Sequence, residues 1–112
     1  MTHPFRKYEI SLLQTLLEGE FSRDQLLRIL DGASDAHVES NGYGFYVSVR
    51  HPAIGSARRV YSGPPSLAGH SDGRMAGFIV LLERGQLTLE IYPWDGDCLP
   101  ATFRDGEVRI GR

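Results

Sequence analysis

Few side chains in this sequence have the type and spacing that catalysis or metal binding requires. The single cysteine, Cys98, has no helix start or basic neighbour that would activate its thiol, so we interpret it as passive. The four histidines share no metal-ligand spacing, and His70-Ser71-Asp72 alone is a weak pair. Asp95-Gly96-Asp97 lacks the distal glutamate of a calcium loop. The sequence therefore predicts no catalytic residue, no metal site and no cofactor.

The most suggestive group combines carboxylates with aromatic rings around the end of one expected strand. We call it the acidic-aromatic group, and its members are Tyr46, Glu90, Tyr92, Trp94, Asp95 and Asp97. Aromatic residues anchor protein interfaces, and carboxylates attract a basic partner. We interpret the group as a candidate protein-binding surface. The alternative is that Tyr92 and Trp94 only cover the sheet edge while the acids, at a turn over 94–97, keep it soluble.

These side chains are positioned by residues 77–92, GFIVLLERGQLTLEIY, which indicate two strands closed by a turn at Arg84-Gly85. A two-residue turn places Glu83 opposite Gln86, and every later pair follows from that register. Three apolar pairs then share the core face: Leu82 with Leu87, Val80 with Leu89, and Phe78 with Ile91. The strand over 78–82 is apolar on both faces, so we expect it to be central in the sheet. A bulged turn is the alternative.

Two helices are expected before the strands. Residues 4–18 carry apolar side chains at helical spacing, and Gly19 is the expected end of this helix. The second helix is expected to begin after Ser22, because Ser22 and Gln25 form a capping box, and to end at Gly32.

From about residue 36 the apolar period changes to two, which predicts strands. We expect one strand over 43–50, joined to a short strand around Val38 by a turn at Asn41-Gly42. Residues 57–61, ARRVY, predict an edge strand with two arginines toward water.

The last two segments have turn-rich sequences. Residues 62–74, rich in Gly, Pro and Ser, predict a long surface loop. At the C-terminal end, Asp105-Gly106 predicts the turn of a second hairpin, which would pair Arg104 with Glu107.

Length and composition are typical of one globular domain over residues 1–112. The chain is 41% hydrophobic and 23% charged, and no run approaches the roughly 18 apolar residues of a membrane span. The N-terminal residues lack a signal-peptide pattern, so we expect a cytoplasmic location. A net charge of −2 and a pI near 6.0 give no general attraction to nucleic acid or to an anionic membrane. The expected fold is α+β, with two N-terminal helices packed on one face of a mostly antiparallel sheet of about five to six strands.

The chain resembles a broad group of small, uncharacterised bacterial proteins with the same order of elements. The matching segments are Phe21-Ser22-Arg23-Asp24-Gln25-Leu26, Gly77-Phe78-Ile79-Val80-Leu81-Leu82, Gly85-Gln86-Leu87 and Leu89-Glu90-Ile91-Tyr92. Many of those proteins have a cysteine-glycine cluster where this chain has Asn41-Gly42-Tyr43-Gly44, so no metal role carries over. Some similar proteins look like immunity partners of bacterial toxins, which implies a partner but no site residue.

The functional prediction is a non-enzymatic protein-binding module whose partner is another protein, with a basic toxin domain as the most concrete example. One alternative is a small-molecule binding domain or enzyme that uses the same acidic and aromatic face. A further alternative is a winged-helix-like DNA binder. Its reading helix would offer only Arg23 and Arg28 as cations, interleaved with Asp24 and Asp31.

Overall fold

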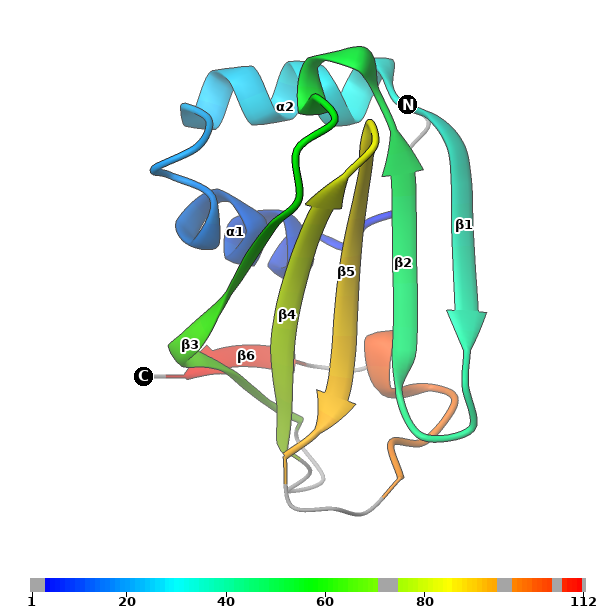
Figure 1. Cartoon of the computed structure of the whole chain (residues 1–112). Helices are drawn as coiled ribbons and strands as arrows, with labels where there is room; N and C mark the ends of the chain where they lie inside the picture. Colours follow the sequence, from blue (N-terminus) through cyan, green and yellow to red (C-terminus); the bar gives the residue numbers. More distant parts are fainter. Residues whose placement is uncertain (1–3, 71–74, 95–97, 106–107, 112) are drawn as a thin grey trace.

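A six-stranded antiparallel sheet with two helices on one side forms the protein (Figure 1). The computed structural model describes residues 4–70, 75–94, 98–105 and 108–111. In chain order the elements are α1 (Lys7–Leu16), α2 (Arg23–Gly32), β1 (Ser34–Ser40), β2 (Phe45–Arg50), the 3-10 helix η1 (Pro52–Ile54), β3 (Arg59–His70), β4 (Met75–Glu83), β5 (Gln86–Pro93), the 3-10 helix η2 (Phe103–Asp105) and β6 (Val108–Gly111). The strand order is β1-β2-β5-β4-β3-β6. The predicted α+β class is confirmed.

The central hairpin has the predicted register. Glu83 lies opposite Gln86, and all three predicted apolar pairs are present, from Leu82 with Leu87 to Phe78 with Ile91. Arg84 and Gly85 have φ angles of 55° and 75°, so both central residues of the two-residue turn are left-handed. This geometry matches the right-handed twist of the flanking strands. Strand β4 is interior, with β5 on one side and β3 on the other.

The two helices are shorter than their apolar patterns, and only α2 has the predicted start. Ser22 and Gln25 form the capping box: the Ser22 hydroxyl accepts from the Gln25 amide at 3.1 Å. Helix α1 begins at Lys7 rather than at residue 4, because the Glu9 carboxylate accepts from the backbone N–H of Arg6 and caps the first turn. It ends at Leu16, before Gly19. The amides of Glu20 and Phe21 both donate to the Leu17 carbonyl and turn the chain toward α2.

The predicted long loop covers residues 62–74, of which 71–74 lie outside the described part of the chain. For residues 62–70 the prediction is wrong, because they continue the strand β3 that begins at Arg59. Its first part pairs with β4, a register shift follows after Ser62, and Leu67–His70 then pair with β4 and with β6. The shift takes up the Pro-rich segment, where missing N–H donors would otherwise break the ladder. Among the described strands, Arg59–Ser62 pair with β4 alone, so the predicted edge position of this segment is confirmed. Leu67–His70 instead lie between β4 and β6, and β6 forms the edge of the sheet there.

One of the two arginines that were expected to face water is instead held beneath the sheet. Arg58 is exposed, but Arg59 lies 3.4 Å from the Glu20 carboxylate and donates to the Ile54 carbonyl at 2.6 Å. Tyr61 donates to the same carboxylate of Glu20. These contacts connect β3 to the link between the two helices.

The predicted C-terminal hairpin is also wrong. Phe103 and Arg104 lie in η2, and the following strand β6 pairs with β3 instead. Residues 106 and 107 lie outside the described part of the chain. Arg104 is only 5% exposed and makes a two-point ion pair with the fully buried Glu9, with both N–O distances at 2.7 Å. A contact between the two ends of the chain, rather than a local turn preference, thus determines the conformation at Arg104.

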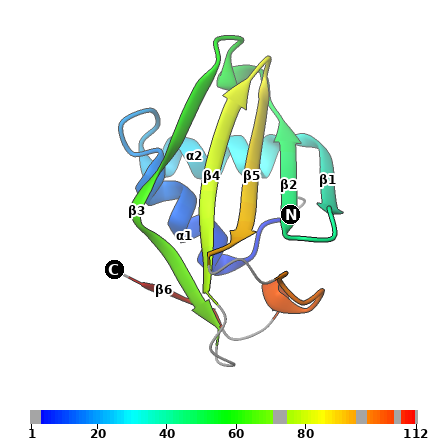
Figure 2. The ribbon, with the colours of Figure 1, turned by 60° about the horizontal axis from the view of Figure 1, so that its bottom comes forward.

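One hydrophobic core fills the space between the helices and the sheet. It receives leucines from both helices, the inward residues of β2, β4 and β5, and Phe103 from η2. The alternation along β5 is strict, since Leu87, Leu89 and Ile91 are each 0% exposed while the residues between them are half-buried. Helices α1 and α2 lie on one side of the sheet (Figure 2). The core lies on that side, and η2 joins it through Phe103.

We expect the Glu9–Arg104 pair to be a strong determinant of stability. Replacing one partner leaves the other charge buried and unpaired, so Arg104→Met should lower the free energy of unfolding by about 3 to 5 kcal/mol in urea titrations. The neighbouring exposed pair Arg6–Asp105 is the matched control, and Arg6→Gln should cost less than about 1 kcal/mol. Similar losses in both variants would contradict a special role for the buried pair.

A second prediction concerns Tyr8, whose buried hydroxyl lies near the Glu9 carboxylate but makes no hydrogen bond of ordinary geometry with any described residue. Burial, followed by the Glu9 carboxylate, raises the pKa of Tyr8 well above its usual value. The unfolded chain would lose this proton near pH 10 while the folded chain keeps it, so stability falls as the pH rises above that value. Tyr8→Phe should therefore add about 1 kcal/mol at pH 7 and reduce the alkaline loss, measured by urea unfolding. Tyr43→Phe, at a tyrosine that is 47% exposed, is the control and should leave the free energy of unfolding at pH 7 nearly unchanged.

Candidate functional site

The face of the sheet opposite the helices is the candidate functional surface, and we call it the open face. Cross-strand pairing defines two rows on it. The rows are Glu39, Tyr46, Glu90, Ile79 and Ser62, and His37, Ser48, Thr88, Leu81 and Val60. Ile79 and Leu81 are only partly buried, and Val60 is 51% exposed. An accessible aliphatic strip thus runs from β4, in the middle of the open face, to β3 at its side.

Four members of the acidic-aromatic group lie at one end of the open face. Tyr46 and Glu90 are direct cross-strand partners, and the Tyr46 hydroxyl donates to Glu90 at 3.5 Å, a long hydrogen bond. On its other side Glu90 lies opposite Ile79. The structure therefore brings together a carboxylate, a phenol and an aliphatic side chain from three adjacent strands, as the sequence predicted for Tyr46 and Glu90.

Tyr92 and Trp94 continue this end of the surface. Tyr92 lies opposite Gly77, and its ring covers the glycine so closely that a Cβ at position 77 would be 2.4 Å from the ring. The Trp94 ring is tilted by 38° against the Tyr92 ring, with centroids 6.5 Å apart, and Trp94 is 56% exposed. Asp95 and Asp97, the other two predicted members, lie outside the described residues.

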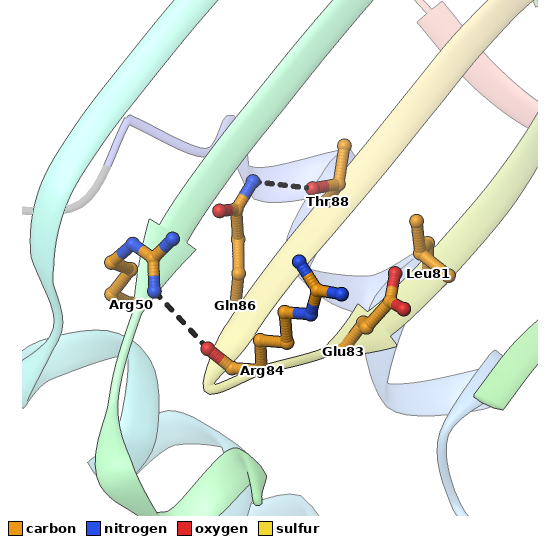
Figure 3. Close-up of a pocket in the computed structure, with 6 residues that line it drawn as sticks. All are labelled: Arg50, Leu81, Glu83, Arg84, Gln86 and Thr88. Carbon is orange, nitrogen blue, oxygen red and sulfur yellow. Dashed lines mark hydrogen bonds between the residues drawn. The ribbon is translucent and has the colours of Figure 1, made fainter. Parts of the chain in front are cut away.

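The opposite end of the open face holds a pocket that the sequence did not reveal (Figure 3). Its volume is about 200 Å³, and its lining residues are Arg50, Leu81, Glu83, Arg84, Gln86 and Thr88. Arg50 comes from β2 and reaches the hairpin because β2 pairs with β5, which places Arg50 opposite Gln86. The hairpin register alone predicts which side chains of β4 and β5 face outward. It does not predict that the end of β2 is their neighbour.

Hydrogen bonds fix part of this pocket. The Arg50 guanidinium donates to the Arg84 carbonyl at 3.1 Å, and the Gln86 side-chain amide donates to the Thr88 hydroxyl at 3.0 Å. Glu83 also contacts Arg58, at 3.9 Å, and Arg58 itself does not line the pocket. Among the described residues, the hairpin end of the open face therefore carries three arginines and one glutamate, whereas the other end carries Glu39 and Glu90.

Catalytic and metal chemistry have little support elsewhere in the described part of the chain. Within it, no group of three or more His, Cys, Asp or Glu side chains is arranged to hold a metal ion. Cys98 is exposed, and the His51 ring accepts a hydrogen bond from the Ala53 amide. None of the described helices is long and apolar enough to cross a membrane.

Comparisons with protein-family models, with curated proteins and with solved structures found no match for this chain. The function must therefore be argued from the open face itself.

The contact between Tyr92 and Gly77 yields a testable prediction. Alanine at position 77 would displace the Tyr92 ring, so Gly77→Ala should lower the free energy of unfolding by about 1 kcal/mol and change the near-ultraviolet circular dichroism. In a Tyr92→Ala background the same change should be neutral or stabilising, because alanine is favoured over glycine within a strand. Equal effects in both backgrounds would mean that the ring does not rest on the glycine.

Proposed function

We propose that this protein is a protein-binding module that presents the open face of its sheet to a partner protein. The observation that carries the proposal is an aliphatic strip on the sheet face opposite both helices, formed by the partly buried Ile79 and Leu81 on β4 and by the exposed Val60 beside them on β3. Contiguous accessible apolar surface of this kind, bordered by polar residues, is typical of interaction sites.

Each part of the face has a physical role in such an interface. The aliphatic strip supplies apolar area to be buried, and Tyr46, Tyr92 and Trp94 supply large rings that lose little conformational entropy on binding. Glu90 and Glu39 favour a basic surface at their end of the face, because complementary charges speed encounter and set orientation. A partner of this kind would place basic side chains over the acidic-aromatic end.

A toxin domain with a basic surface is the concrete partner class that we propose, in line with the resemblance to immunity-like bacterial proteins. The cytoplasmic location predicted from the sequence agrees with this role and also remains part of the proposal. A non-enzymatic mode of action, by covering the partner's surface, requires no catalytic residue.

The proposal is tested by affinity capture from the native cell lysate at physiological salt, with three baits in parallel. The wild-type bait should retain a protein that a Val60→Asp bait does not, because the charge would be buried in the interface. Leu27→Asp is the matched control, since Leu27 is a 37% exposed leucine on α2, and it should retain the same protein as the wild type. Retention that is equal for all three baits, or absent for the wild type, would contradict binding through the open face.

Once a partner is captured, its binding kinetics should separate the rings from the charges. Truncating a central interface tryptophan commonly costs about 2 kcal/mol or more, so Trp94→Ala should weaken binding mainly through faster dissociation. Glu90→Gln should mainly slow association and reduce its salt dependence. Surface plasmon resonance at two salt concentrations measures both effects. Unchanged kinetics in both variants, with the fold intact by circular dichroism, would move the interface away from the acidic-aromatic end.

A further inference from the structure

We propose that the pocket at the β4–β5 turn binds a small oxyanion, namely the carboxylate or phosphate group of a small molecule, between Arg84 and Arg50. This site lies at the opposite end of the open face from the acidic-aromatic group, and the proposal does not rest on the protein partner proposed above.

Arg84 occupies a turn position at which the fold does not require an arginine. Its φ of 55° lies in the left-handed region, where a two-residue hairpin turn favours asparagine or glycine at the first central position. A side chain with a Cβ costs free energy there, and such strain tends to persist at sites where it serves a function. Its guanidinium is exposed and has no hydrogen bond or ion pair with any described residue. Figure 3 shows it lying along the pocket between Gln86 and Glu83.

Arg50 supplies a second cation whose position is already fixed. Its Nη1 donates to the carbonyl of Arg84 itself, so the two residues are coupled across adjacent strands. A guanidinium carries five N–H donors, and this bond uses one of them. The remaining donors form a fork that matches both carboxylate and phosphate oxygens. Holding the side chain in advance lowers the entropy cost of binding.

Neutral donors complete the lining. The Thr88 hydroxyl accepts from the Gln86 amide, which leaves the hydroxyl proton of Thr88 available for an oxyanion. Leu81 forms an apolar wall. A volume of about 200 Å³ suits a small acid or a single phosphate group and is below the roughly 300 Å³ at which drug-sized ligand pockets begin.

Glu83 opposes an anion and therefore provides a signed test. The charged lining residues are two arginines, Arg50 and Arg84, and one glutamate, Glu83. Arg58 lies 3.9 Å from the Glu83 carboxylate and partly offsets its negative charge. The lining thus has a net positive charge that favours an anion, and the Glu83 carboxylate reduces the affinity. Removing this carboxylate should strengthen anion binding, whereas a merely structural turn would not respond in this way.

The experiment is a titration followed by amide signals in two-dimensional 1H–15N NMR spectra at pH 7. Sodium acetate and sodium phosphate are added in separate arms, with sodium chloride as the third arm at matched ionic strength. We expect saturable shifts at the amides of residues 84–88 with acetate, phosphate or both, and the stronger arm identifies the carboxylate or the phosphate class. Shifts that are equal in the chloride arm, or absent in all arms, would overturn the proposal.

Variants make the assignment specific to the pocket. Arg84→Asn suits the left-handed turn, so the fold should be kept. The affinity for the anion should fall by about tenfold, because one charge-assisted hydrogen bond is lost. Arg84→Lys should also bind more weakly than the wild type, because an ammonium lacks the fork. Glu83→Gln should bind more tightly. Arg28→Gln, at an exposed arginine on α2, is the matched control and should leave the dissociation constant unchanged.

Equal weakening in Arg28→Gln and Arg84→Asn would overturn the site, since it would show only a response to net charge. This titration uses no protein partner, and the capture experiment uses variants at Val60 and Leu27, neither of which lines the pocket. The failure of one proposal is therefore distinguishable from the failure of the other.

Discussion

The two-residue turn at Arg84-Gly85 is the constraint on which the rest of the structure depends. Side chains in a strand alternate between faces, so a turn longer by one residue would exchange the faces of β5 relative to β4. With both turn residues at positive φ, Leu87, Leu89 and Ile91 enter the core, and Gln86, Thr88 and Glu90 face outward. The pairing of β2 with β5 then transmits this division to the neighbouring strand. Both the core and the open face follow from one turn.

The elements that the sequence predicted well are those whose signals are local. The hairpin register and the Ser22 cap depend on residues within a few positions of one another, and both are as expected. The contact between Tyr46 and Glu90 was anticipated because each lies on the outward side of a strand with a clear period of two. The pocket was missed because Arg50 joins it through a pairing between strands that are distant in sequence, for which no local pattern exists.

The failures have a common physical cause, which is that tertiary contacts overrode local preference. Pro64 and Pro65 indicate a loop, yet the register shift in β3 accommodates the segment that contains them, and pairing continues on both sides. Asp105-Gly106 favours a hairpin turn, but Arg104 lies in η2 instead of a strand and pairs there with Glu9. The buried carboxylate of Glu9 needs a cation, and leaving it unpaired costs more than a turn preference supplies. A long-range ion pair therefore decides the structure of the C-terminal segment.

The charges of the open face are separated along the strands, and this separation restricts how any protein could bind there. Arg50, Arg58 and Arg84 lie around the hairpin end, whereas Glu39 and Glu90 lie toward the other, with the aliphatic residues between them. A partner rotated by half a turn over the same aliphatic strip would bring like charges together at both ends, and like-charge contacts are costly in an interface. The apolar residues thus contribute contact area but do not distinguish one orientation of the partner from another. The charges at the two ends distinguish between them. An oxyanion in the pocket would neutralise part of the positive end, so its presence would weaken the preference for one orientation over the other.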